Sequence, residues 1–214
     1  DFLYENLFHP AGMETTGYSR PQFAPDSIAV GHRWDGSLWG KPTDKQWDGN
    51  APFWHLKGNG GILTTVLDMS KWSVALRGDK ILSPAAKQKL HHPRLRANES
   101  ENPYYGYGWD IFKTKRNTFL ASHNGTNNIF YAEMHRFLDE NVTIIHMVNK
   151  GIPSFVDVNN QIARIIFEPA YIPTVPAAES PENKQFTDEI INIVIDKGID
   201  AALRAVKVRT PGLG

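Results

Sequence analysis

The sequence contains no cysteine among its 214 residues. Without cysteine, the chain can form neither a disulfide nor a thiolate metal site, and it cannot use a cysteine nucleophile. This absence does not fix the cellular compartment. The sequence also has no apolar run approaching the roughly 20 residues that a helix needs to cross a bilayer. We therefore expect no membrane-spanning segment.

The charge balance shows no excess of either sign. Lys plus Arg and Asp plus Glu each total 23, which gives a formal net charge of zero. Nucleic-acid-binding proteins usually carry a basic excess that gathers on one face, and the sequence contains no such cluster. We therefore expect no nucleic-acid partner and no adhesion to anionic membranes. A folded globular domain is expected, because 41% of the residues are apolar and 21% are charged.

Histidine is present, but not in a metal-binding pattern. His91 and His92 are adjacent, so on a helix their side chains would point about 100° apart, and no carboxylate follows either of them four residues later. We expect both to lie on a solvated surface. His32 and His55 likewise lack ligand spacing with the nearby aspartates. The sequence therefore predicts no metal site and no cofactor.

Hydrophobic periodicity and capping residues predict both helices and strands, and therefore an α+β fold. Either Thr64 or Thr65 can cap a helix that carries Asp68 in its first turn, and Ser83 followed by Pro84 begins another helix. The first of these helices should present one face made of Val66, Met69, Trp72, Ser73 and Leu76. Further helices are predicted at 1–9 and 154–167, and strands at 104–112, 120–123, 129–136 and 142–149, with a turn at 138–141.

Residues 14–58 show no sustained period and are rich in Gly, Pro, Asp and Trp. Large rings recur in this segment too often for a solvated linker, so we expect an ordered excursion. The rings either pack beneath their own loop or form an apolar wall beside a binding cleft, and the sequence leaves both interpretations open. The aromatic residues concerned are Trp34, Trp39, Trp47, Phe53 and Trp54.

Prolines mark a boundary near the C-terminal end. Four of them fall between residues 169 and 181, which predicts an extended, semi-rigid link. We therefore expect a main domain over 1–168, a Pro-rich linker over 169–181 and a small helical extension over 182–214. The first residue is Asp, not Met, and residues 1–9 have the pattern of a helix already under way. We also expect the chain to be part of a longer protein.

Four segments carry family motifs in a fixed order. They are ENLFHPAGMETT at 5–16, GGILTTVLDMSKW at 60–72, YGYGW at 105–109 and HNGT at 123–126. These segments resemble the N-I-F-x-P-L-G-M, G-G-L-x-S-T-x-x-D-L, Y-G-Y-G-W and Lys-Thr-Gly or His-x-Gly segments of one superfamily of serine hydrolases. It is the β-lactamase and penicillin-binding-protein superfamily, with class C β-lactamases, esterases and D-aminopeptidases among its members. Each motif is weak alone, but the order of all four is specific.

The resemblance implies a β-lactamase/transpeptidase-like fold, in which an antiparallel sheet flanked by helices adjoins an all-helical part. In that family a Ser-x-x-Lys helix supplies the nucleophile and its activating lysine, and a Tyr-x-Asn loop supplies a second base. No Ser-x-x-Lys occurs in this sequence, and the Tyr-x-Asn pattern that begins at Tyr4 lies inside the first predicted helix. Both motifs lie upstream in the family. We therefore expect a C-terminal part of the domain that is inactive by itself.

The resemblance also implies roles for the HNGT segment. The backbone N–H of Thr126 would stabilise an oxyanion, a contribution on the order of 3–4 kcal/mol to the barrier. Gly125 would let the substrate approach the strand closely, and His123 would supply a hydrogen bond or positive charge where many members have Lys. A His at this position favours esterase or peptidase chemistry over efficient β-lactamase activity. The expected substrate contacts are Asn124, Asn127 and Asn128, the last two having a turn-shaping role as the alternative.

The sequence thus predicts the C-terminal portion of a serine hydrolase that acts through an acyl-enzyme on a small ester, amide or peptide. Two alternatives stay open: a non-catalytic binding or regulatory module that kept the fold, and a fragment that complements a separate nucleophile-bearing chain. A partial domain would expose a sheet edge and a core face, so we expect self-association through that surface. Export to the periplasm or outside the cell is expected from the family.

Overall fold

The computed structural model describes residues 1–18, 21–45, 58–96, 103–151 and 157–173. The chain divides into two compact units, Asp1–Phe167 and Glu168–Gly214. Residues 174–214 lie outside the described residues, and so do most of the predicted Pro-rich linker and all of the predicted extension over 182–214. The first unit contains all the helices and strands in the described part of the chain. None of these helices has the length and apolar character needed to cross a bilayer.

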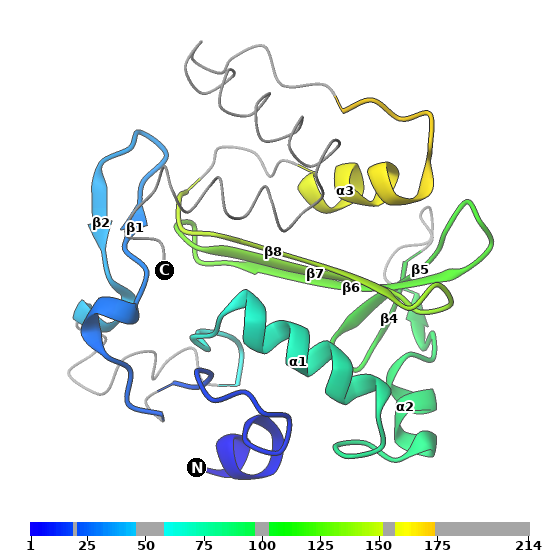
Figure 1. Cartoon of the computed structure of the whole chain (residues 1–214), viewed down its shortest axis with the longest axis horizontal. Helices are drawn as coiled ribbons and strands as arrows, with labels where there is room; N and C mark the ends of the chain where they lie inside the picture. Colours follow the sequence, from blue (N-terminus) through cyan, green and yellow to red (C-terminus); the bar gives the residue numbers. More distant parts are fainter. Residues whose placement is uncertain (19–20, 46–57, 97–102, 152–156, 174–214) are drawn as a thin grey trace. The chain divides into compact units, whose positions relative to one another are not determined.

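The first unit is built on a six-stranded sheet in which every strand is antiparallel to its neighbours (Figure 1). The order of strands in space is also their order in the sequence, so each strand hydrogen-bonds to the next along the chain. Antiparallel neighbours need only short connections, and turn-forming residues separate these strands. The strands are β3 (Leu95–Arg96), β4 (Pro103–Gly106), β5 (Trp109–Lys113), β6 (Phe119–Thr126), β7 (Tyr131–Phe137) and β8 (Val142–Val148).

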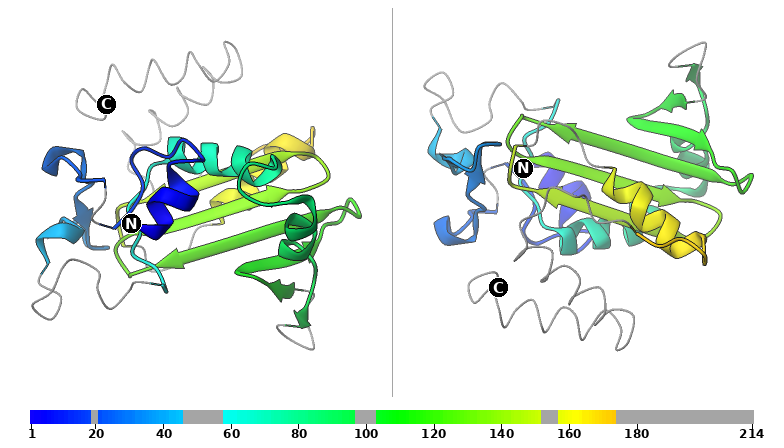
Figure 2. Two further views of the ribbon diagram at one scale, coloured as in Figure 1. Left: turned by 90° about the horizontal axis from the view of Figure 1, so that it is seen from below. Right: turned by 90° about the horizontal axis from the view of Figure 1, so that it is seen from above.

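Helices cover both faces of this sheet, as the two views of Figure 2 show. The helices α1 (Val66–Arg77) and α2 (Pro84–Leu90) lie on one face, and α3 (Val158–Phe167) lies on the other. Because successive strand residues point to opposite faces, each central strand contributes to both cores. The core under α1 includes Leu76, Trp109, Ile111, Ala121 and Met134, and the core under α3 includes Leu120, Phe137, Ile144 and Ala163. This arrangement confirms the predicted α+β class with an antiparallel sheet flanked by helices.

The start of α1 is held by a buried carboxylate, that of Asp68, which is only 2% exposed. Thr65 is the cap, because its hydroxyl oxygen accepts the backbone N–H of Asp68 at 3.1 Å. The carboxylate accepts the N–H and the hydroxyl of Thr15 at 2.7 Å each, the hydroxyl of Thr16 at 2.9 Å, and the ammonium of Lys71 at 2.9 Å. Burial alone would raise the pKa of Asp68, but these bonds together lower it. Asp68 therefore ties the N-terminal segment to α1.

Several predicted elements have different boundaries in the structure. The predicted strand 104–112 is a hairpin, because the chain reverses at Tyr107 and Gly108, whose φ angles are 45° and 81°. Two successive residues with positive φ are the requirement of a type I′ hairpin turn. The predicted helix 154–167 corresponds to α3, which begins at Val158. Residues 152–156 lie outside the described ranges. The strand predicted at 120–123 is longer, since β6 extends from Phe119 to Thr126.

The described helices and strands that precede α1 are short. The predicted helix 1–9 contains a π-helical turn, η1 (Tyr4–Phe8), in which the N–H of His9 bonds to the carbonyl of Tyr4. The aromatic-rich segment contains a two-stranded ribbon, β1 (Gly31–His32) with β2 (Leu38–Gly40), between the short 3₁₀ turns η2 (Pro25–Ser27) and η3 (Pro42–Asp44). Of the five aromatic residues predicted to pack there, Trp47, Phe53 and Trp54 lie outside the described residues.

Candidate functional site

The end of β6 lacks a strand partner on one side. β6 pairs with β7 from Leu120 to Thr126, but it pairs with β5 only as far as Ser122. Beyond Ser122, β5 gives way to the turn that leads back to β4. In the described part of the chain, residues 123–126 therefore have a hydrogen-bonded strand on one side only. These are the four residues of the HNGT segment.

Two hydrogen bonds outside the regular ladder show which residues of β6 face β7. The N–H of Leu138 donates to the carbonyl of Phe119 at 2.9 Å, and the N–H of Asn127 donates to the carbonyl of Phe130 at 3.2 Å. In an antiparallel strand, the N–H and C=O of one residue point to the same neighbour, and those of the next residue point away from it. The odd-numbered residues of β6 thus bond to β7. Asn124 and Thr126 consequently direct their N–H and C=O groups to the open side.

The side chains of this segment divide between the two faces of the sheet. His123 and Gly125 follow Ala121 and so lie on the face of α1, whereas Asn124 and Thr126 follow Leu120 and lie on the face of α3. Residues 123–128 are all exposed. A Cβ added to Gly125 would meet no atom within 4 Å. The strand edge is therefore accessible above Gly125.

His123 lies next to Tyr105 of β4. The hydroxyl of Tyr105 and Nε2 of His123 lie 3.4 Å apart, at the long end of the hydrogen-bonding range, and the ring centroids are 6.4 Å apart. Tyr105 belongs to the β4–β5 hairpin, which thus brings the phenol close to His123 at this edge. Tyr105 was not among the predicted site residues. The YGYGW motif contains Tyr105, but the sequence alone does not show that the β4–β5 hairpin places this residue beside His123.

The two predicted substrate contacts after the strand form a turn. The side-chain oxygen of Asn127 accepts the N–H groups of Ile129 at 3.1 Å and Phe130 at 2.7 Å. Asn128 has a φ of 70°, a conformation that Asn adopts more readily than most residues. Its N–H donates to the hydroxyl of Thr126 at 2.9 Å. These bonds and the backbone conformation give both asparagines a turn-forming role. A contact of either residue with substrate remains a prediction.

The β1–β2 ribbon lies beside this turn. The N–H of His32 donates to the carbonyl of Asn149. A Cβ at Gly31 would lie 2.5 Å from Cγ2 of Ile129, so the side chain of Ile129 packs directly against the backbone of the ribbon. Trp39 packs edge-on against Phe130 with 5.9 Å between ring centroids. Trp34, by contrast, is 69% exposed. The aromatic segment therefore borders the turn through Trp39.

The chemistry available at this edge is hydrogen-bond donation to an oxygen or to an extended chain. The open N–H groups of Asn124 and Thr126 are two residues apart on one strand, so each can donate to a separate carbonyl oxygen and the two together can pair with an extended peptide chain. No Ser-x-x-Lys pattern exists in the sequence to provide an activated nucleophile. Among the described residues, no group of three or more His, Asp or Glu side chains lies close enough together to hold a metal ion.

Comparison with known proteins gives consistent results. The profile of the Beta-lactamase family matches residues 1–166. A penicillin-binding protein of Bacillus subtilis is 26% identical over 156 residues, which cover 70% of this chain and 34% of that protein. The D-amino acid amidase of Ochrobactrum anthropi superimposes with a TM-score of 0.59 at 20% identity, covering 77% of this chain and 48% of the amidase. The octameric penicillin-binding protein homologue from Pyrococcus abyssi gives a TM-score of 0.55 at 18% identity, covering 69% of this chain and 33% of that one. The chain thus spans a third to a half of the length of these relatives.

Proposed function

The chain belongs to the beta-lactamase family of serine hydrolases, and we propose that it is the C-terminal portion of such an enzyme, which works through an acyl-enzyme. In this proposal a Ser-x-x-Lys segment outside these 214 residues carries the nucleophile. Residues 1–168 then form part of the hydrolase domain, and 169–181 link it to a helical extension over 182–214. The chain alone does not turn over substrate.

The observation that carries the proposal is the one-sided end of β6, with its open N–H groups beside His123. The lysine of the Ser-x-x-Lys segment takes the serine proton as the serine oxygen bonds to the substrate carbonyl carbon. The carbonyl electron pair moves to oxygen, and the N–H of Thr126 donates to that oxyanion. The acyl-enzyme forms when this pair returns and the alcohol or amine leaves with the proton. Such donors are already oriented before the reaction, which is why each one lowers the barrier substantially. The open space above Gly125 admits the substrate, and the imidazole of His123, next to the phenol of Tyr105, donates a hydrogen bond to it.

The proposed substrate is a small ester, amide or D-amino-acid peptide. The D-amino acid amidase supports this class, because its fold superimposes on 77% of this chain. Asn124 directs a second open N–H and C=O pair to the same side as Thr126, which suits an extended substrate added to the strand edge. We propose Asn124 as a substrate contact through its backbone, with Asn127 and Asn128 as contacts at the end of the strand.

The intact mass and the covalent labelling of the natural protein test this proposal. We expect a mass well above 24 kDa and labelling by a fluorophosphonate serine probe. A natural protein near 24 kDa that takes up no probe would favour the two alternatives, a binding or regulatory module with this fold or a chain that complements a separate nucleophile-bearing partner. Saturable turnover of a p-nitrophenyl ester by the 214-residue chain would contradict the proposed inactivity.

Two substitutions in the active natural protein separate the role of the Thr126 N–H from that of its side chain. Thr126→Pro removes the N–H, and because this N–H points away from β7, no ladder hydrogen bond is lost. Thr126→Ala keeps the N–H and removes the hydroxyl. We expect kcat to fall about 10²–10³-fold for the proline variant and only a few-fold for the alanine variant. Equal effects of the two, with unchanged melting temperatures, would exclude the oxyanion role.

We also propose that the chain self-associates through the free edge of β8. Within the described residues, β8 hydrogen-bonds to β7 on one side and has no strand on its other side. An edge of this length with apolar residues is a template for pairing with another strand. The Pyrococcus abyssi homologue is octameric, which supports assembly in this family. Light scattering after gel filtration should detect oligomers, and a monodisperse monomer would contradict this part of the proposal.

A further inference from the structure

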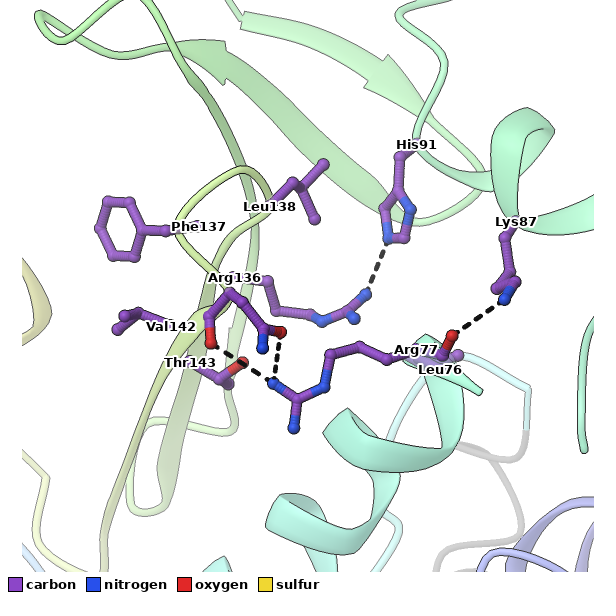
Figure 3. Close-up of a pocket in the computed structure, with 10 residues that line it drawn as sticks. Leu76, Arg77, Lys87, His91, Arg136, Phe137, Leu138, Val142 and Thr143 are labelled. Atoms are coloured by element: carbon purple, nitrogen blue, oxygen red, sulfur yellow. Dashed lines mark hydrogen bonds between the residues drawn. The ribbon is translucent and has the colours of Figure 1, made fainter. Parts of the chain in front are cut away.

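A cavity of about 260 Å³ lies at the end of the sheet opposite the HNGT segment (Figure 3). It is formed where the turn between β7 and β8 meets the C-terminal end of α1 and the end of α2. The HNGT segment lies beside the β6–β7 turn, at the other end of β7, which spans roughly 20 Å at about 3.3 Å per residue. The cavity therefore does not belong to the proposed catalytic edge.

Three cationic side chains line this cavity, Arg77, Lys87 and Arg136. Arg136 is only 4% exposed, and its guanidinium donates to Nε2 of His91 at 2.8 Å (Figure 3). Its Nε has no hydrogen-bond partner among the described residues. Arg77 donates to the side-chain oxygen of Asn141 at 2.7 Å. Both guanidinium groups thus bond to neutral acceptors.

No carboxylate in the described residues neutralises either arginine. Lys87 has a partner, since its ammonium pairs with Asp79. Burial, and secondly the charge of Arg77, lower the pKa of Arg136 to about 10, so Arg136 is still protonated at neutral pH. A buried cation whose charged neighbour has the same sign destabilises the folded state unless an anion compensates it.

We propose that this cavity binds a small oxyanion, the carboxylate or phosphate group of a compact molecule. The planar guanidinium is the side chain best suited to bind such a group through two parallel hydrogen bonds, and Arg136 and Arg77 bring two of them to one cavity. The buried Nε of Arg136 has no partner among the described residues, so the protein leaves one donor of this guanidinium unsatisfied. The cavity volume of about 260 Å³ limits the ligand to a compact one, and Leu138 and Val142 supply an apolar part of the lining.

Titration of the chain with inorganic phosphate and, separately, with succinate at pH 7 tests this inference. Binding is measured by calorimetry and by the rise in melting temperature, with sodium chloride at equal ionic strength as the reference. We expect at least one of the two anions to bind with a Kd of about 1 mM or tighter. Binding of phosphate alone would identify a tetrahedral ligand, and binding of succinate alone a carboxylate, and both results support the site.

Three variants make the test specific. Arg77 is exposed, so Arg77→Gln should fold normally and weaken binding about tenfold or more, as expected for a lost charge-assisted bond. Arg136→Met should abolish binding. Lys89→Gln removes the same charge from an exposed position of α2 that does not line the cavity, and it should leave the Kd within about twofold. The inference fails if neither anion binds more tightly than chloride, or if Arg77→Gln and Lys89→Gln weaken binding equally.

Discussion

Acid should destabilise this chain in a pH range set by His91. The imidazole Nε2 of His91 accepts a hydrogen bond from the Arg136 guanidinium, so the ring is unprotonated at that atom. Protonation would place a second positive charge against Arg136 in a partly buried position. Burial, followed by the charge of Arg136, accordingly lowers the pKa of His91 from 6.5 to about 4.

The direction of the effect follows from proton binding. Between pH 6.5 and about 4, the unfolded chain binds a proton at His91 that the folded chain does not. The free energy of unfolding therefore falls as the pH is lowered through this range, and it levels off below pH 4 as far as His91 is concerned. At 1.36 kcal/mol per pKa unit the upper limit is roughly 3 kcal/mol. Because His91 is partly exposed and solvent screens its charge, we expect about 2 kcal/mol.

Urea unfolding of the wild type and of His91→Gln at pH 7, 6, 5 and 4 measures this contribution. A glutamine side-chain oxygen can accept the same bond from Arg136 and does not titrate. Burial also lowers the pKa of His146, but that group is common to both proteins and cancels in the difference. We expect the wild type to lose about 2 kcal/mol more than the variant between pH 7 and pH 4. Parallel curves would refute the role of the His91–Arg136 pair.

Two matched pairs of substitutions give further predictions about stability. Asp68→Ala should cost about 3–5 kcal/mol in urea unfolding, because it leaves four hydrogen-bond donors, one of them charged, without their buried acceptor. Asp26→Ala, at an exposed position, should change stability by less than about 0.5 kcal/mol, and a similar loss in both variants would argue against the Asp68 cluster. Gly125→Ala should keep the melting temperature, since the added Cβ meets open space, whereas Gly106→Ala should lower stability by about 1–3 kcal/mol, since its Cβ would lie 2.7 Å from the carbonyl of His92. Equal melting temperatures for the two glycine variants would show that the backbone at Gly106 can shift away from the carbonyl of His92 at little cost.

Features set by neighbours in the sequence were predictable. The Thr65 and Ser83 caps were confirmed, because a cap acts within three residues of itself. The turn at 138–141 was confirmed as well, since β7 ends at Phe137 and β8 begins at Val142. Periodicity gave the direction of the buried face of α1 but not its extent. Met69, Trp72 and Leu76 pack in the core, whereas Val66 in the first turn is 47% exposed.

Features that depend on distant residues were missed. His91 was predicted to be solvated, and this was wrong, because it lies partly buried against Arg136, 45 residues further along the chain. His92 is exposed as predicted. The hairpin at Tyr107 was missed because its left-handed conformation is unusual for an aromatic residue, and the aromatic run has the composition of one strand. The open side of β6 follows from where β5 begins, which no local pattern shows.

The order of strands in the sheet has a consequence for how the protein folds. Since each strand from β3 to β8 pairs with the next one along the chain, nearly all sheet contacts have a small sequence separation, and relative contact order within the sheet is low. Chains with low contact order close small loops and fold quickly. The register of β6, and with it the direction in which Asn124 and Thr126 point their N–H groups, is decided by two hairpins within residues 109–137. The ladder can therefore nucleate before any distant segment arrives, so these two residues take up their orientation early in folding.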